Sequence, residues 1–139
     1  MSTNTLQYTG APVSTLVESF RRLLAADPNR HLLHLPASER SLTAQDLWNS
    51  SSRVIDGLEQ GGVIPGSLVV SAVGNRASCV SLLLATRRLG AALLAVDSGT
   101  TAPELRDICR QFDAAAAIPP AWASISTSMT AGTIGWPGK

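Results

Sequence analysis

The chain has 139 residues, a length that suits one domain with a core of its own. Hydrophobic residues make up 45% of the chain and charged residues 15%, a balance that excludes intrinsic disorder. The net charge is only +1 and the basic residues are scattered, which excludes a field strong enough to attract nucleic acid or an anionic membrane.

The N-terminal part of the chain is predicted to hold a lead-in, one helix and a small hairpin. Residues 1–12 are polar and lack periodicity, so we expect a flexible lead-in. Thr15 is predicted to cap the first helix, with Glu18 completing a capping box. The apolar face of that helix would consist of Leu16, Phe20, Leu23 and Leu24. The segments 32–35 and 40–42 flank a turn at residues 36–39 and predict a hairpin outside the main sheet.

A second helix is predicted to begin directly after Thr43. The Thr43 hydroxyl can cap this helix, and Asp46 can accept hydrogen bonds from the free amides of its first turn. Its buried side would consist of Leu47, Val54 and Leu58. The helix ends at Gly61 and Gly62, and the short turn that follows predicts that it packs against the central sheet.

The stretch 68–97 predicts a strand, a helix and a second strand. Residues 68–73 are uncharged and mostly β-branched or aliphatic, as in a strand covered on both faces. A helix over 77–89 would end at Gly90, in the position of a left-handed C-cap. Its apolar positions are Val80, Leu83, Leu84 and Leu89. Residues 93–96 form the next strand, and a helical crossover of this length makes the two strands parallel.

A third helix and a third strand complete the predicted sheet. Thr101 would cap the helix together with Glu104, and residues 114–118 form a weak strand that stops at two prolines. The apolar side of this helix would consist of Leu105, Ile108, Cys109 and Phe112. The order β-α-β-α-β predicts an α/β fold: parallel strands, flanking helices and the small N-terminal hairpin. Residues 119–139, rich in Ser, Thr and Gly, are expected to be an irregular tail.

The sequence gives no sign of a membrane span or a targeting segment. No apolar run approaches the roughly 20 residues that a spanning helix needs. The first ten residues lack the basic and apolar regions of a signal peptide. We therefore expect a soluble, cytoplasmic protein with neither a membrane span nor a nucleic-acid partner.

Few side chains in the sequence suggest a reactive site. Cys79 and Cys109 are 30 positions apart, which is neither a metal spacing nor a redox pair, so both are expected to be buried as small hydrophobes. His31 and His34 have no third metal ligand nearby and are expected at the surface or in packing. Trp48 is either cover on a helix or a binding platform.

Asn75 and Asp97 are the best-placed candidates for a small-molecule crevice. Each follows a predicted parallel strand, and open α/β sheets bind ligands at the carboxyl ends of their strands. The alternative is that the two side chains close turns and cap the helices that follow.

Several stretches match one known pattern in order and spacing. They are Leu42-Thr43-Ala44-Gln45-Asp46-Leu47, residues 62–69, Asn75, Leu89-Gly90-Ala91, Val96-Asp97 and residues 101–108. Over residues 13–118 the chain resembles the N-terminal part of the AMP-dependent synthetase and ligase family: acyl-CoA synthetases, luciferases and peptide-synthetase adenylation domains. Ser67 and Ala95 replace an aspartate and a proline of the family pattern.

The resemblance implies that residues 13–118 form the first subdomain of an AMP-binding ligase. In the parent family the reaction uses ATP and Mg²⁺ to activate a small carboxylic acid as acyl-AMP, and then passes the acyl group to coenzyme A or another thiol carrier. The resemblance also implies that the catalytic lysine and the nucleotide contacts come later in a longer chain. We expect a partial or truncated ligase that has no catalytic residue, is inactive and binds no cofactor tightly. The alternative is a free-standing, non-catalytic α/β binding module.

Residues 130–137 resemble a degraded copy of the family's Gly- and Thr-rich phosphate loop. The candidate phosphate contacts are Thr130, Gly132, Thr133 and Gly135. Glycines suit such a loop because they let backbone amides approach the phosphates. Ala131 replaces a serine of the family loop and Gly138 replaces its lysine. The alternative is a Gly- and Thr-rich tail that matches by composition alone.

Overall fold

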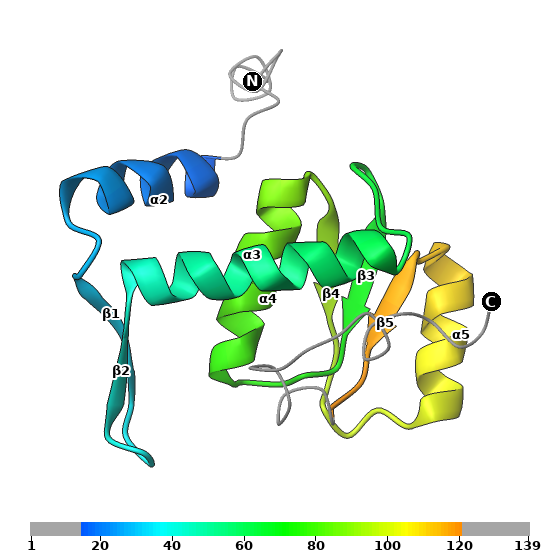
Figure 1. Cartoon of the computed structure of the whole chain (residues 1–139). Coiled ribbons are helices and arrows are strands. Elements are labelled where there is room, and N and C mark those ends of the chain that lie inside the picture. Colours follow the sequence, from blue (N-terminus) through cyan, green and yellow to red (C-terminus); the bar gives the residue numbers. More distant parts are fainter. Residues whose placement is uncertain (1–14, 121–139) are drawn as a thin grey trace, which may run out of the picture.

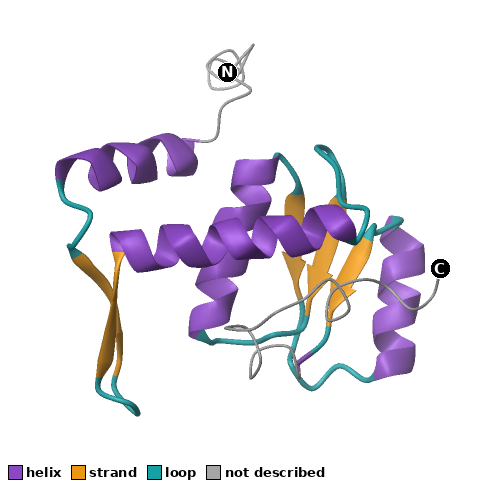
Figure 2. Cartoon of the chain, in the orientation of Figure 1, coloured by secondary structure: helices purple, strands orange, loops and turns teal. Residues whose placement is uncertain are grey.

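A computed structural model describes residues 15–120 of the chain, drawn in Figures 1 and 2. Its elements in order are α2 (Thr15–Ala26), β1 (His31–Leu35), β2 (Arg40–Thr43), α3 (Ala44–Gln60), β3 (Leu68–Ser71), α4 (Ala77–Leu89), β4 (Ala92–Ala95), α5 (Ala102–Phe112) and β5 (Ala116–Ile118). The three later strands form a parallel sheet in the order β4-β3-β5. The predicted α/β fold is therefore confirmed.

The middle strand β3 and the two residues after it, Ala72 and Val73, are covered on both faces, because apolar side chains of this stretch lie on both. Val69 and Val73 belong to one cluster of buried residues, which α3 and α4 complete. Val70 and Ala72 belong to a second cluster, which α5 completes. Figure 2 shows the corresponding arrangement, with α5 on the opposite side of the sheet from α4. The sheet is thus the middle layer of three.

Helix α3 begins where its capping residues predict. The Thr43 hydroxyl accepts a hydrogen bond from the Asp46 amide at 3.1 Å, and the Asp46 carboxylate accepts one from the Thr43 amide at 3.0 Å. Leu47, Val54 and Leu58 are buried, as predicted. The helix lies across α4 and against the sheet (Figure 1).

Strands β1 and β2 form the predicted antiparallel hairpin, which stands apart from the parallel sheet (Figure 1). Backbone hydrogen bonds join the segment before the hairpin to the start of α3. The Ala44 amide donates to the Arg30 carbonyl at 2.9 Å, and the Gln45 amide donates to the Pro28 carbonyl at the same distance. The hairpin is therefore held at the N-terminal end of α3.

The apolar positions noted in the sequence of α4 only partly coincide with its buried residues. Leu84 is buried, but Val80 and Leu83 are 37% and 40% exposed, and Leu82 is fully buried instead. The other buried positions are the small or polar residues Ser78, Ser81, Ala85 and Thr86. The reason is that α4 packs both on the sheet and against α3. A helix with two neighbours buries a wider arc than one apolar stripe indicates.

Several helix ends also differ from their predictions. Thr15 already lies within α2 and is not its N-cap. Leu16 in the first turn of α2 and Phe112 at the end of α5 are 41% and 51% exposed. Periodicity marks the apolar side of a helix but not how far along it a neighbour reaches. Over residues 15–120, no helix combines the length and apolar character needed to cross a membrane.

Candidate functional site

The carboxyl ends of β3 and β4 lie side by side, and the loops that follow them touch. Hydrogen bonding between the strands continues to the edge, where the Val96 amide donates to the Ser71 carbonyl at 2.8 Å. Gly74 has a φ of +84°, and a Cβ atom there would lie 3.1 Å from the Cβ of Ser98. Both this conformation and this close approach are unfavourable for a residue with a side chain, so the position suits glycine. Asn75 therefore shares one edge of the sheet with Asp97, as predicted for a crevice.

The predicted alternative role of Asn75 and Asp97 as helix caps is wrong. Arg76 is the N-cap of α4, and Thr101 is the N-cap of α5. Asp97 closes a turn through its backbone, because its carbonyl accepts a hydrogen bond from the Thr100 amide at 3.0 Å. Both side chains are exposed, and neither has a hydrogen-bond partner within residues 15–120. They are thus available to a ligand at this edge.

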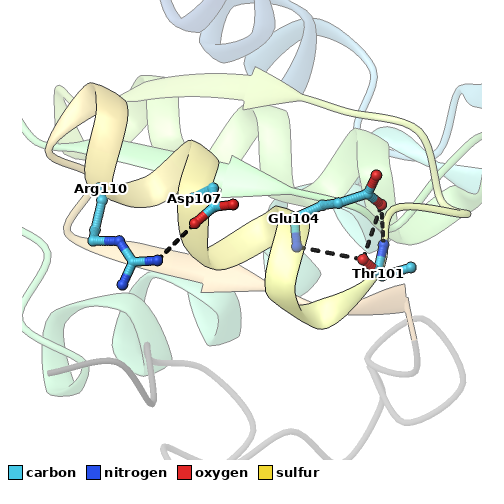
Figure 3. Close-up of polar contacts among 4 residues, drawn as sticks. All are labelled: Thr101, Glu104, Asp107 and Arg110. Atoms are coloured by element: carbon cyan, nitrogen blue, oxygen red, sulfur yellow. Dashed lines mark hydrogen bonds and ion pairs between the residues drawn. The ribbon is translucent and has the colours of Figure 1, made fainter.

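The carboxylate of Glu104, in the helix that follows Asp97, stabilises the start of that helix (Figure 3). The Glu104 carboxylate accepts hydrogen bonds from the Thr101 amide and the Thr101 hydroxyl, both at 2.9 Å. The bond from the Thr101 amide, and secondarily the bond from its hydroxyl, hold the pKa of Glu104 below its ordinary value. Farther along the helix, Arg110 and Asp107 form an exposed ion pair at 2.6 Å. The Glu104 carboxylate therefore has a structural role, as part of the capping box of α5.

The other single-residue candidates do not form a site among the described residues. His31 and His34 are exposed, and Nδ1 of His34 lies 3.1 Å from the Ser41 hydroxyl. No three His, Cys, Asp or Glu side chains within residues 15–120 are placed to hold a metal ion. Cys109 is buried, which raises the pKa of its thiol, and Cys79 is half-buried. The expectation that both cysteines act as packing residues is confirmed for Cys109 and only partly for Cys79.

Trp48 provides cover between helices. Its ring stacks with Phe20 of α2 at a centroid distance of 5.9 Å. The Arg88 guanidinium of α4 lies 3.6 Å from the Trp48 ring centroid. Of the two predicted roles for Trp48, the structure favours packing.

The candidate phosphate contacts Thr130, Gly132, Thr133 and Gly135 lie outside the described residues, so the loop stays a prediction.

A groove of about 310 Å³ lies between the hairpin, α3 and the first turns of α4. Its lining consists of Leu35, Arg40, Leu42, Asp46, Leu47, Asn49, Ser50, Arg53, Ala77, Ser78 and Ser81. Sequence reasoning missed this Ser78 groove, because its lining comes from three elements and forms no motif. One feature of the sequence could have indicated the groove. The N-cap residue of α4 is Arg76, whereas α3 and α5 are each capped by the hydroxyl of a threonine.

Comparison with known proteins gives one consistent family. The family model described as AMP-binding enzyme matches residues 20–132. The nonribosomal peptide synthetase fmqA of Aspergillus fumigatus is 31% identical over 93 residues, which are 67% of this chain and 2% of that protein.

Solved structures of adenylation enzymes have the same fold. A putative long-chain-fatty-acid CoA ligase from Rhodopseudomonas palustris is similar with a TM-score of 0.62 and 26% identity, over 73% of this chain and 25% of that one. The N-terminal subdomain of NpsA from Klebsiella oxytoca, in complex with 3-hydroxyanthranilyl-AMSN, has a TM-score of 0.61 and 19% identity, over 71% of this chain and 25% of that one. This chain thus covers about a quarter of these two solved chains.

Proposed function

The chain belongs to the AMP-binding enzyme family, and we propose that its residues 13–118 form the first subdomain of an adenylate-forming ligase. The observation that carries the proposal is the family match over residues 20–132. The similarity of the sheet, helices and hairpin to the NpsA N-terminal subdomain supports it. The chain covers only part of an adenylation domain.

The whole enzyme would activate a carboxylic acid with Mg-ATP as acyl-AMP and then transfer the acyl group to coenzyme A or another thiol carrier. Such chemistry depends mainly on electrostatic stabilisation of the phosphates by a loop, a metal ion and basic side chains. The described residues 15–120 contain no lysine, although the family uses a catalytic lysine later in its chain. We therefore propose that this chain supplies the scaffold but not the reaction.

Two assays on the full 139-residue chain test whether it is inactive on its own. Calorimetry should detect no tight binding of Mg-ATP, and a carboxylate-dependent ATP–pyrophosphate exchange assay should detect no turnover. One-to-one binding of Mg-ATP would contradict the expectation and mark Thr130, Gly132, Thr133 and Gly135 as a working phosphate loop. Exchange with any carboxylic acid would show that the chain is itself an adenylating enzyme.

A chimera tests the scaffold role directly. Residues 15–118 replace the matching segment of the Rhodopseudomonas palustris ligase, and the exchange activity of the chimera is compared with that of the unmodified ligase. We expect a folded chimera to keep measurable exchange, because this segment supports the active site without supplying its reacting groups. A folded chimera without exchange, together with a monodisperse isolated chain, would instead favour a free-standing binding module.

A further inference from the structure

We propose that the Ser78 groove binds a small phosphorylated ligand. The groove lies where three elements meet, so its polar groups converge on one space of about 310 Å³. That volume is at the lower end of the range for small-molecule sites, as suits a metabolite-sized ligand. This inference is independent of the proposed ligase scaffold.

The first observation is an unsatisfied hydroxyl. Ser78 is only 8% exposed, and its Oγ has no hydrogen-bond partner among the described residues. Burying a hydroxyl without a partner costs free energy, so native proteins rarely keep one. Ser78 lines the groove, and although its Oγ exposes less than 1 Å², a rotation about the Cα–Cβ bond would bring the hydroxyl to a ligand there, which would supply the missing partner.

The second observation is the charge of the groove. Arg40 from the hairpin and Arg53 from α3 both line it, and both side chains are exposed. Neither arginine forms an ion pair within 4.0 Å in residues 15–120, but the charge of Arg40 helps to lower the pKa of Asp46. Asp46 is the groove's one carboxylate, and its Oδ2 already accepts the Thr43 amide at 3.0 Å. Two guanidinium groups and one ionised carboxylate leave the lining with one net positive charge, which favours an anion.

The third observation is the N-terminus of α4, which opens onto the groove through Ala77 and Ser78. Its N-cap residue Arg76 makes no side-chain capping bond, and its first turn has no acidic residue. In contrast, α3 and α5 both carry complete capping boxes. The Cys79 amide already donates to the Arg76 carbonyl at 2.9 Å, which leaves the amides of Ala77 and Ser78. An anion at the start of α4 would take the place of the missing cap, because these two amides and the helix dipole favour negative charge there.

These donors suit a phosphoryl group better than a carboxylate. Two arginines on different elements, the Ser78 hydroxyl and a helix N-terminus exceed what the two oxygens of one carboxylate can use. A phosphate monoester offers three terminal oxygens with more charge. Leu35, Leu42 and Leu47 form the remaining wall and would contact the body of the ligand.

Titration of the full chain with inorganic phosphate, followed by backbone amide resonances at constant ionic strength, tests the site. We expect saturable shifts at Ser78, Ser81 and Arg53. The substitution Arg53→Gln should weaken phosphate binding about tenfold, because it removes a charged donor. Arg87→Gln, an exposed arginine of α4 outside the groove, is the matched control and should leave the affinity unchanged.

The variant Ser78→Ala separates a binding role from a structural one. In phosphate-free buffer this variant should be at least as stable as the parent chain, because it removes an unsatisfied hydroxyl. The extra stability that phosphate confers on the parent chain should be reduced in the variant. A structural hydroxyl would give the opposite result, with a loss of stability in both buffers.

Three results would overturn the proposal. The first is a set of shifts that do not saturate, or that Arg53→Gln leaves unchanged. The second is equal binding of acetate and phosphate at these residues, which would remove the assignment to a phosphoryl group. The third is a loss of stability in Ser78→Ala without phosphate.

Discussion

The guanidinium of Arg88 lies 3.6 Å from the centroid of the Trp48 ring, and its Nη1 donates to the hydroxyls of Ser51 and Ser52 at 2.7 and 2.8 Å. One residue of α4 thereby contacts three residues of α3. The same Trp48 ring stacks with Phe20 of α2. Burial, and secondarily the charge of Arg21, lowers the pKa of Arg88. Side chains of three helices, α2, α3 and α4, therefore meet around the Trp48 ring.

Substitution of Arg88 should destabilise the chain even where the charge is kept. Arg88→Lys should lower the free energy of unfolding by about 1 kcal/mol, since a lysine loses the stacking and the two-hydroxyl contact, and Arg88→Ala by about 2 kcal/mol. Urea denaturation measures both. Arg87→Lys is the control, because the neighbouring Arg87 is exposed. Equal stability of Arg88→Lys and the parent chain would show that the contact contributes only charge.

Gly74→Ala should lower the free energy of unfolding more than an alanine substitution at another glycine with a positive φ. Gly66 has a φ of +90° and open space around a Cβ, whereas a Cβ at Gly74 meets Ser98 at 3.1 Å. Gly66→Ala should cost about 1 kcal/mol of backbone strain, and Gly74→Ala measurably more. Adding Ser98→Gly to Gly74→Ala should recover part of the difference. Without recovery, the two loops would not be in contact as described.

The capping box of α3 should make stability depend on acid pH. Hydrogen bonds from the Thr43 amide, and secondarily from its hydroxyl, hold the pKa of Asp46 below its ordinary value. A carboxyl with a lowered folded pKa stabilises the fold above its unfolded pKa and loses that contribution as the pH falls. The contribution should therefore be complete at neutral pH and fade below about pH 4.

Denaturation of Asp46→Asn at several pH values measures this effect. The stability gap between the variant and the parent chain should shrink from about pH 6 to pH 3, because only the parent carboxylate titrates. Asp56→Asn, at an exposed position of the same helix, is the matched control for loss of one carboxylate. Thr43→Ala should cost about 1 kcal/mol at neutral pH, as is usual for a lost N-cap.

The two cysteines should differ in reactivity. Cys109 is 3% exposed and burial raises the pKa of its thiol, so little reactive thiolate reaches solvent. Cys79 is half-buried and should react first with Ellman's reagent, because its sulfur is the more accessible of the two. In Cys79→Ser the fast phase should disappear, and the remaining thiol should react only as the chain unfolds. A fast phase that persists in Cys79→Ser would contradict the burial of Cys109.

The sequence by itself determined the elements whose signals are local. The capping pairs Thr43 with Asp46 and Thr101 with Glu104 each span three residues, and both were found as predicted. Hydrogen bonds this short depend only on neighbouring residue types. The edge shared by Asn75 and Asp97 was also predictable, because parallel strands end on the same side.

Only the tertiary structure decided which side chains are buried and which meet. Leu82 is buried while Leu83 is exposed, because α4 packs on both the sheet and α3. Arg88 reaches the carbonyl of Trp48 across 40 positions, and Ser78 shares its groove with Arg53 of another helix. These relationships depend on where separate elements come to lie in space, which no local pattern of residues specifies.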